Sequence, residues 1–572
     1  MNAQSPALVA SRPERLRLVG QRRQTLAVMH QRLMFAMLLF AGLVALVALR
    51  ILWLAAFGDH AGRKTGVTTL IPERGDIVDR DGQPLARTID AWTIAIHPTK
   101  IIGDKLAIAR SLARLMPERS EEQYFAMMRS GKPFFYLRRR ASPGVVSAVN
   151  ALGDPGLAIQ REPDRLYPQT SLAAHVIGFT DIDGHGVAGM ERAYDDYLSN
   201  PDTRGQPLTL SIGNRYQQAL EHELSAAMTS FSAIGAAGVI MDLHTGEVLA
   251  MTSLPALNLN IAGQGSPDAR FNRATLGVYE LGSTFKPFTV AMAMDSGIIK
   301  SFGQMYNCPH ELHVYGRVIH DTHPFGRRCT VAEILKESSN IGTAQIAHEL
   351  GAVRQKAFLK KMGFLDKVQV ELKERGRTLT AGARWGPLET MTVGYGHAIA
   401  VTPLHLATGY ATLFNGGIYR PATLLKIGPG HPVPKGHRVF TEETSYKMRA
   451  LLRLVVTQGT GKKADAPGYR VGGKTGTAQK IVGGHYSQTV VLTSFAGVFP
   501  MDEPRYVMVM MLDEPKETAE TFGFRYASWN VAPAFSRTVS RIGPMLGVHP
   551  DKNREPNMQE VLPFVHDEHP KG

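Results

Sequence analysis

The most uniform hydrophobic stretch of the chain lies near its N-terminus. Leu33–Leu49 contains no charged residue, and after Arg50 a second apolar run follows at Ile51–Phe57. At 1.5 Å per residue, the first run covers roughly 25 Å of a hydrocarbon core that is about 30 Å thick. The pattern therefore predicts one membrane-spanning helix within residues 33–57, with Arg50 near the far interface, where its long side chain can reach water.

Beyond this span, the hydrophobic pattern is that of a folded protein with helices and strands. Apolar residues recur at helical spacing in Asp104–Met116 and Arg215–Met228, whereas Ala237–Met241 and Val248–Thr252 predict a hairpin. Val471–Leu512 is rich in strand-forming residues. We expect a basic tail at 1–32, an anchor at 33–57, a first α+β domain at 58–232, a larger one at 233–548, and a polar, loosely ordered tail at 549–572.

Composition and charge narrow the class of protein. The 572 residues allow three or four domains, and 44% hydrophobic with 20% charged residues excludes a disordered chain or a many-span membrane protein. The net charge of +14 first suggests a nucleic-acid or membrane-surface partner. However, residues 1–32 hold six Arg against one Glu, a local balance of +5, and the other +9 is dispersed over 540 residues. We therefore expect no nucleic-acid partner.

The basic head instead indicates membrane topology. Arginines before the span and few after it predict a cytoplasmic N-terminus, with the rest of the chain outside. A cleaved signal peptide is the alternative, but its apolar region would be only about 7–15 residues long. The apolar run is longer here and no convincing cleavage site follows, which favours an uncleaved, single-pass anchor.

The first candidate for chemistry is Ser283-Thr284-Phe285-Lys286, the only Ser-x-x-Lys in the chain. Pro287 is tolerated only in the first turn of a helix, so a helix is expected to start near Ser283. Residues three apart share a helix face, which would place the Lys286 amine beside the Ser283 hydroxyl. A serine needs such a base to become a nucleophile, and the lysine needs a lowered pKa to serve as one. Alone, the motif is more typical of an ordinary surface turn of a helix than of a catalytic site.

Two further motifs strengthen the assignment. Ser338-Ser339-Asn340 follows a helical pattern at Val331–Glu337, and Lys474-Thr475-Gly476-Thr477 opens a strand-like stretch. Each motif has a decoy elsewhere, at Lys64-Thr65-Gly66 and at Ser528-Trp529-Asn530. The ordered set Ser-x-x-Lys, Ser-x-Asn and Lys-Thr-Gly, at intervals of 55 and 136 residues, is far more specific than any one motif.

With these motifs in order, the sequence resembles the class B penicillin-binding proteins, which are peptidoglycan D,D-transpeptidases. Asp181-Ile182-Asp183-Gly184-His185-Gly186 looks more like the division-specific, FtsI-type branch than the elongation branch. The resemblance covers most of residues 33–548. It also rests on boxes of the non-catalytic pedestal domain, namely Arg74–Gly82, Arg165–Pro168, His175–Gly178, Gly186 and Gly189–Glu191, and on Gly473–Gln479 around the third catalytic motif.

The resemblance implies an α+β fold with a pedestal at 58–232 and, at 233–548, a transpeptidase domain whose antiparallel sheet is covered by helices, as in serine β-lactamases. It implies acyl transfer without metal or cofactor in septal cell-wall synthesis. Stem peptides and β-lactams would be the ligands, and an FtsW-type glycan polymerase and other division proteins the partners at the inner membrane. The implied catalytic residues are Ser283, Lys286, Ser338, Asn340 and Lys474, and the implied substrate-binding residues are Thr475, Gly476 and Thr477.

Two positions depart from the family pattern. Leu281 replaces the usual Pro, and Gly394-Tyr395-Gly396-His397 replaces the commoner Ser-Tyr-Gly-Gln. Neither departure removes a reacting group. They therefore put in question only the detailed geometry of substrate binding, and not the reaction. An elongation-specific transpeptidase stays the alternative. A β-lactamase is disfavoured because no Glu-x-x-Leu-Asn string occurs, and a sensor, a bifunctional class A enzyme or a non-enzymatic scaffold is less expected.

Cys308 and Cys329 leave three possibilities open. On the outer side of a membrane they could form a disulfide. They could also be free or buried thiols. The interval between them holds four histidines and Asp321, so zinc binding is the third possibility, although the spacing is irregular. Finally, Phe134–Arg140 could suggest a nucleic-acid patch, but its place in the chain favours a pedestal strand.

Overall fold

The computed structural model describes residues 31–50, 74–380, 382 and 385–566, which belong to two units, 1–70 and 71–572. In the first unit, the described residues form one helix, Gln31–Arg50, which is long and apolar enough to cross a membrane. This helix fits the predicted single-pass anchor. The predicted basic tail up to residue 30 and the end of the predicted span at 51–57 lie outside the described residues.

The pedestal is built around one long strand, β2. Strand β2 pairs antiparallel with β3 and β4, and β1 joins β2 to β5, which it meets in parallel. Apolar residues of β2 and β3 pack against the three helices that lie between η1 and β4. The strands are β1 (Ile77–Val78), β2 (Pro84–Ile96), β3 (Phe135–Ala141), β4 (Leu157–Leu166) and β5 (Leu208–Thr209). The helices are η1 (Pro98–Lys100), α2 (Lys105–Leu115), α3 (Glu121–Arg129), α4 (Pro143–Asn150), α5 (Ala174–Ile177), α6 (Gly189–Ala193) and α7 (Asp195–Ser199).

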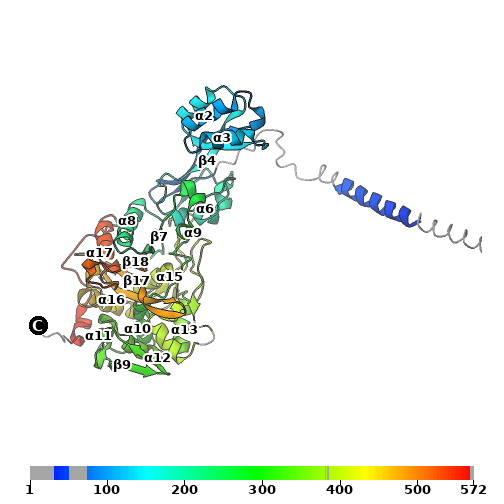
Figure 1. Cartoon of the computed structure of the whole chain (residues 1–572). Helices are drawn as coiled ribbons and strands as arrows, with labels where there is room; N and C mark the ends of the chain where they lie inside the picture. Colours follow the sequence, from blue (N-terminus) through cyan, green and yellow to red (C-terminus); the bar gives the residue numbers. More distant parts are fainter. Residues whose placement is uncertain (1–30, 51–73, 381, 383–384, 567–572) are drawn as a thin grey trace, which may run out of the picture. The chain divides into compact units, whose positions relative to one another are not determined.

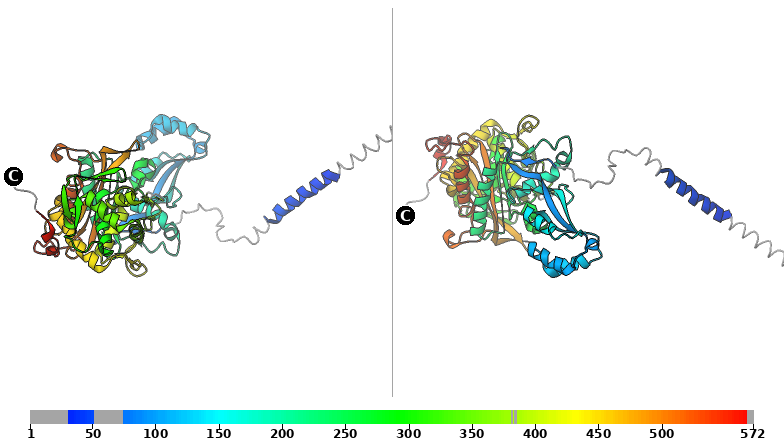
Figure 2. Two further views of the ribbon diagram at one scale, coloured as in Figure 1. Left: turned by 90° about the horizontal axis from the view of Figure 1, so that it is seen from below. Right: turned by 90° about the horizontal axis from the view of Figure 1, so that it is seen from above.

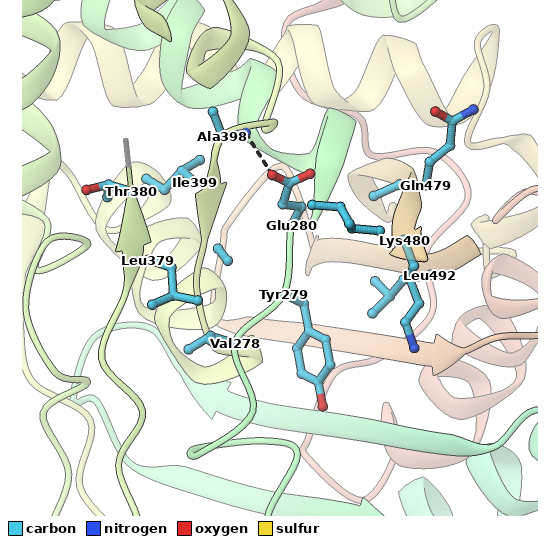
Figure 3. Close-up of a pocket in the computed structure, with 13 residues that line it drawn as sticks. Val278, Tyr279, Glu280, Leu379, Thr380, Ala398, Ile399, Gln479, Lys480 and Leu492 are labelled. Carbon is cyan, nitrogen blue, oxygen red and sulfur yellow. Dashed lines mark hydrogen bonds between the residues drawn. The ribbon is translucent and has the colours of Figure 1, made fainter. Parts of the chain in front are cut away.

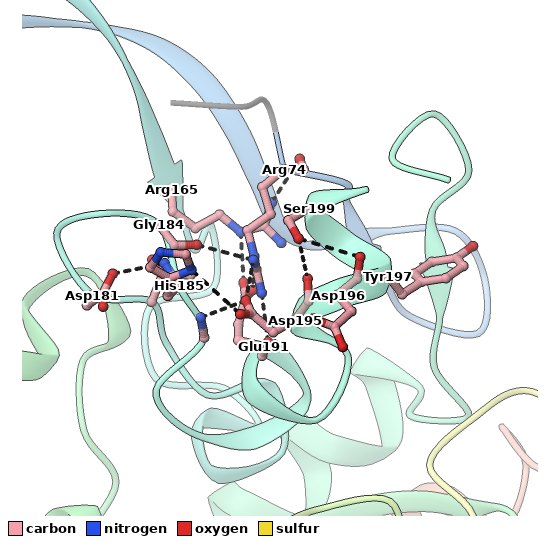
Figure 4. Close-up of polar contacts among 12 residues, drawn as sticks. Arg74, Arg165, Asp181, Gly184, His185, Glu191, Asp195, Asp196, Tyr197 and Ser199 are labelled. Carbon is pink, nitrogen blue, oxygen red and sulfur yellow. Dashed lines mark hydrogen bonds and ion pairs between the residues drawn. The ribbon is translucent and has the colours of Figure 1, made fainter. Parts of the chain in front are cut away.

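The pedestal boxes seen in the sequence meet in a buried ion-pair network (Figure 4). Glu191 is fully buried and accepts hydrogen bonds from Arg74 Nε at 2.5 Å and from Arg165 Nε at 2.7 Å. Arg74 also donates to Asp195 at 2.7 Å. A buried carboxylate is stable only when such partners compensate for its lost hydration, so these boxes hold the pedestal together rather than line a reaction site.

The second domain is organised by a five-stranded antiparallel sheet in the order β16-β17-β18-β6-β7. Side chains alternate along β18, with Val507, Val509 and Met511 in one core cluster and Met508, Met510 and Leu512 in another. Both faces of the sheet are therefore covered. The strands are β6 (Gly235–Asp242), β7 (Val248–Leu254), β16 (Gly472–Val482), β17 (His485–Phe499) and β18 (Tyr506–Asp513).

Helices supply the two covering layers (Figure 1). Helices α8 and α17 pack on one face of the sheet, while α15, α16 and α10 contribute to the core on the other. Because β6 and β7 come early in this domain and β16–β18 late, segments from green to red interleave within it (Figure 2). The helices are α8 (Asn214–Ser230), η2 (Leu259–Gln264), α9 (Pro267–Arg270), η3 (Gly282–Phe285), α10 (Lys286–Asp295), α11 (Val331–Lys336), α12 (Asn340–Leu350), α13 (Ala352–Lys361), α14 (Pro387–Gly394), α15 (Pro403–Phe414), α16 (Glu442–Thr457), η5 (Lys462–Ala464), η6 (Ala519–Thr521) and α17 (Val531–Ile542).

Among the described residues of this domain, four two-stranded ribbons accompany the sheet, and one of them carries the cysteines. Cys308 and Cys329 lie on the paired strands β8 and β11, and the structure joins them in a disulfide. The disulfide is thus the arrangement found among the three possibilities, and within residues 74–380 and 385–566 no group of three His, Cys, Asp or Glu side chains gathers as a metal site. The ribbons are β8 (Met305–Cys308) with β11 (Arg327–Thr330), β9 (Glu311–Val314) with β10 (Arg317–His320), β12 (Leu379–Thr380) with β13 (Ile399–Ala400), and β14 (Ile418–Tyr419) with β15 (His437–Arg438).

Most predicted elements are confirmed. Helices α2, α8 and α11, the β6–β7 hairpin and the strands within Val471–Leu512 lie where the hydrophobic pattern placed them, and strand β3 lies where the place of Phe134–Arg140 in the chain favoured a strand. The prediction of a loosely ordered C-terminal tail is wrong for residues 549–566. Two short helices, η7 (Met558–Glu560) and η8 (Leu562–Phe564), pack there, and Val561 is completely buried.

The tail is ordered because a few specific contacts outweigh its polar composition. Arg453 pairs with Glu555 at 2.6 Å, and Thr330 Oγ1 donates to the Phe564 carbonyl at 2.7 Å. The prediction from sequence used the average polarity of the segment. It therefore gave no weight to Val561 and Phe564, two apolar side chains that pack in the core of the domain.

Candidate active site

The Ser-x-x-Lys motif lies at the start of a helix. Ser283 is in the tight turn η3, and α10 begins at Lys286, with Pro287 in its first turn as expected. The backbone N–H of Lys286 donates to the Ser283 carbonyl, which keeps the two residues on one turn. Ser283 is only partly buried, whereas Lys286 is completely buried. The hydroxyl can therefore meet a ligand while the amine is shielded from water.

The Lys286 amine is held by Ser338. Lys286 Nζ donates to Ser338 Oγ at 3.1 Å and also to the Ser338 carbonyl. Burial lowers the pKa of Lys286 well below its ordinary value, and the positive charge of Lys474 lowers it further, whereas Asp321 opposes the shift. The structure therefore disfavours the charged form of this amine, which is the direction that a general base requires.

Ser338 lies on the turn between α11 and α12, and Asn340 is the first residue of α12. Ser338 has a φ of +63°, a left-handed conformation that costs energy for a residue with a side chain. The turn is fixed by Asp321, which follows β10. Asp321 accepts hydrogen bonds from Ser339 Oγ at 2.6 Å, from Ile341 N at 3.1 Å and from the Asn340 backbone N–H.

Lys474 lies on β16, the edge strand of the sheet. Its Nζ donates to Thr460 Oγ1 at 3.3 Å and to Thr475 Oγ1 at 3.2 Å, and these two hydroxyls are 2.9 Å apart. Burial lowers the pKa of Lys474 to about 7, while the charge of Glu337 partly opposes this. Lys474 can therefore change its charge near neutral pH.

Small residues let β16 approach the serine turn. A Cβ on Gly476 would lie 2.4 Å from the Leu281 carbonyl oxygen, and one on Gly282 would lie 3.2 Å from the Thr477 carbonyl oxygen. Gly396, with a φ of +85°, leaves no room for a Cβ, which would lie 2.0 Å from the Gly282 oxygen. Thr477 Oγ1 accepts a hydrogen bond from Ala527 N at 3.1 Å, which fixes it beside the turn.

The three motifs are therefore neighbours, although more than 50 residues separate each from the next. The hydrogen bonds of Lys286 join the first motif to the second, and the close approach of Gly476 and Gly282 joins the third to the first. Of the decoys, Lys64-Thr65-Gly66 lies outside the described residues, and Asn530 caps α17. The structure brings together the residues named from the sequence: Ser283, Lys286, Ser338, Asn340, Lys474, Thr475, Gly476 and Thr477.

Sequence reasoning missed three residues of this site. Asp321 was noticed only as a zinc candidate, and its role at the turn before α12 depends on a contact between distant segments. Thr460 follows α16 in a Gly-Thr-Gly sequence that signals a turn but not its contact with Lys474. Glu280 precedes Leu281 and accepts a hydrogen bond from Ala398 N at 2.9 Å. No local pattern distinguishes it from a surface carboxylate.

Comparisons with known proteins identify both domains of the chain. Residues 236–535 match the penicillin-binding protein transpeptidase domain, and residues 69–219 match the penicillin-binding protein dimerisation domain. The chain is 38% identical to the probable peptidoglycan D,D-transpeptidase FtsI of Caulobacter vibrioides, over 87% of this chain and 85% of that protein. It is 29% identical to the peptidoglycan D,D-transpeptidase FtsI of Escherichia coli, over 90% and 92% of the two chains.

A solved structure shows the same architecture. The crystal structure of penicillin-binding protein 3 from Mycobacterium tuberculosis in complex with aztreonam aligns with a TM-score of 0.66 and 25% identity, covering 84% of this chain and 97% of that one. The two matched domains together account for the pedestal and for the sheet that carries the serine turn. The chain therefore belongs to the class B penicillin-binding proteins, as a peptidoglycan D,D-transpeptidase of the FtsI type.

Proposed function

We propose that Ser283 is the nucleophile of this transpeptidase and that Lys286 is the base that activates it. The observation that carries the proposal is the environment of Lys286, which is completely buried, is hydrogen-bonded to Ser338 and lies near the positive charge of Lys474. These features favour a neutral amine next to a serine that a ligand can reach.

In the proposed acylation, Lys286 takes the proton of the Ser283 hydroxyl while Ser283 Oγ bonds to the carbonyl carbon of the penultimate D-Ala. The backbone N–H groups of Ser283 and Thr477 stabilise the oxyanion. The bond to the terminal D-Ala then breaks, and its amine takes a proton through Ser338. In the second step, the amine of another stem peptide bonds to the carbonyl carbon of the acyl-enzyme and loses a proton to Lys286. Lys286 passes this proton to Ser283 Oγ as the acyl–oxygen bond breaks, which restores the free serine.

The remaining site residues are proposed to bind the substrate. The hydroxyls of Thr475 and Thr477 suit the terminal carboxylate, and Lys474 adds positive charge. Gly476 allows β16 to approach the serine turn, and the Asn340 amide suits the peptide group of the donor. A β-lactam would occupy the same positions and form a stable acyl-enzyme with Ser283.

We also propose that the anchor places the N-terminus in the cytoplasm and the catalytic domain in the periplasm. Six arginines within residues 1–32 support this orientation. The similarity to FtsI proteins supports a role in septal synthesis, with an FtsW-type glycan polymerase and other division proteins as partners. Septal localisation of a fluorescent fusion is the expected result, and a dispersed lateral pattern would favour the elongation alternative.

An amine-exchange reaction tests the mechanism. The full chain, in membranes, is incubated with a stem pentapeptide that ends in D-Ala-D-Ala and with a fluorescent D-amino acid as acceptor. Mass spectrometry should show a product in which the terminal D-Ala is replaced, and Ser283→Ala should form none. An equal yield of this product with Ser283→Ala would overturn the assignment of the nucleophile.

A further inference from the structure

A cavity of about 480 Å³ opens next to the serine turn (Figure 3). One wall is the outer part of β16, from Ala478 to Ile481, and another is Val278–Glu280, which leads into the turn. The ribbon of β12 and β13 forms the third side. The first two walls come together where a Cβ on Gly282 would touch both Thr477 and Ala478, so the cavity lies beside the serine turn.

The lining is mostly apolar, with Val278, Leu379, Ile399, Ile481 and Leu492 among the residues that form it. Its two charged residues differ in how they are paired. The ammonium of Lys480 is engaged by Asp513 and Glu514, each at 2.8 Å, so its charge is compensated inside the protein. The charge of Glu280 is not compensated in the same way.

Glu280 is about four-fifths buried and contacts mainly neutral groups. Its carboxylate accepts hydrogen bonds from Ala398 N at 2.9 Å and from the Tyr486 hydroxyl at 3.1 Å. His397 Nδ1 lies 3.8 Å away, but burial is the main cause that lowers the pKa of this histidine to about 4, which leaves it neutral at neutral pH. A carboxylate with neutral partners in an apolar cavity would be stabilised by a cationic ligand.

The direction of the substrate indicates which group would reach this cavity. Resting on the function proposed above, the donor's terminal carboxylate lies at Thr475 and Thr477, near the start of β16. A peptide added antiparallel to this edge strand then runs toward Ala478–Ile481, so the residue before the two D-Ala residues faces the cavity. Cross-linking by transfer to an amine also requires that stem peptides carry an amino group.

We propose that this cavity is a donor subsite in which Glu280 recognises the ammonium of an amino-bearing side chain, at the stem-peptide residue that precedes D-Ala-D-Ala. The apolar walls contact the aliphatic part of that side chain, and Glu280 pairs with its end. Glu280 is thus a specificity-determining residue, distinct from the groups that form and break bonds.

Two penicillins test this subsite. Both carry an acyl side chain at the position of the donor residue, Nα-acetyl-lysyl in one and Nα-acetyl-norleucyl in the other, so they differ only in the terminal ammonium. The second-order rate of acylation of the full chain in detergent is measured by competition with a fluorescent penicillin. The wild type should react with the lysyl compound about tenfold faster than with the norleucyl compound. This ratio corresponds to the free energy of one hydrogen bond between charged groups.

Glu280→Gln keeps the hydrogen-bond acceptor and removes the charge, so the preference should fall to near one. Glu442→Gln makes the same charge change at an exposed site on α16 and should keep the tenfold preference. Thr380→Lys, on an exposed part of the cavity lining, provides an internal ammonium and should reduce the preference even if Glu280→Gln fails to fold.

The proposal is overturned if the wild type shows no preference, or if Glu280→Gln or Thr380→Lys retains it in full. Failure of Ser283 to react with either compound and with the fluorescent penicillin is a different result. That outcome would contradict the assignment of the nucleophile, and with it the function on which the subsite rests.

Discussion

Lys286 Nζ donates a hydrogen bond to Ser338 Oγ over 3.1 Å, across 52 residues of sequence. This contact connects the serine turn to the Ser-x-Asn turn and gives the amine a partner that carries no charge. With Lys474 nearby, the ammonium form of Lys286 is disfavoured twice, by burial and by like charge. The following predictions depend on this arrangement of charges and turns.

Replacing Lys286 by arginine should separate positive charge from basicity. Lys286→Arg keeps a cation but cannot accept a proton near neutral pH, because the pKa of arginine lies above 12. Acylation of Ser283 by a fluorescent penicillin should slow by about 10²–10⁴-fold, the usual contribution of a general base. If Lys286→Arg retained the wild-type rate, the general base would have to be another group.

The acylation rate should depend on pH in two opposite ways. The rate should rise as Lys286 loses its proton, because the base must be neutral. It should fall as pH rises through about 7, where Lys474 loses the charge that attracts the substrate carboxylate. Lys474→Arg keeps its charge at higher pH, so the falling limb should disappear from the profile. A falling limb that is unchanged in Lys474→Arg would show that another group causes it.

Asp321 should act as a positioning residue for the turn that carries Ser338 and Asn340. Asp321→Ala removes the acceptor of Ser339 Oγ and of two backbone N–H groups, so acylation should slow by about tenfold or more, which corresponds to losing hydrogen bonds to a charged group. Because the Asp321 charge raises the pKa of Lys286, the rising limb of the pH profile should also move to lower pH in Asp321→Asn.

A purely structural role for Asp321 would slow acylation without moving this limb, which makes the pH profile the deciding readout. Asp183→Asn, a matched change at an exposed pedestal turn, should leave both the rate and the profile as in the wild type.

Gly396 should be intolerant of substitution. In Gly396→Ala, a Cβ would lie 2.0 Å from the Gly282 oxygen, and the φ of +85° is unfavourable for alanine. The serine turn must shift, so penicillin labelling should decrease strongly. The free energy of unfolding should fall by about 1–3 kcal/mol, which is the usual cost of a strained residue. Gly430→Ala is a control with a similar φ and open space around it, and it should retain labelling.

Removing the disulfide should destabilise the chain. In Cys308→Ser with Cys329→Ser, the loss of a crosslink over 21 residues should cost about 3 kcal/mol of unfolding free energy. Denaturant unfolding measures this difference. The mass of the intact wild type should increase by two hydrogens on reduction, and an unchanged mass would contradict the pairing.

The sequence predicts the elements and the identity of the motifs better than their contacts. Strands β6 and β18 can be recognised in the sequence because apolar residues fill both of their faces. Ser283, Lys286 and Lys474 can be recognised because their motifs follow one another in a fixed order. The hydrogen bonds of Asp321 to the turn before α12 could not be predicted, because they depend on how the β9–β10 ribbon packs against α12. Likewise, the tail at 549–566 is polar on average, yet Val561 is buried in the core and Phe564 packs against it.

The most direct test of the account is to locate the covalent adduct. The full chain is incubated with benzylpenicillin, digested and analysed by mass spectrometry. One penicilloyl group should be found on the peptide that contains Ser283, and Ser283→Ala should carry none. An adduct on a different residue of the wild type, or an undiminished adduct in Ser283→Ala, would contradict the assignment of Ser283 as the nucleophile.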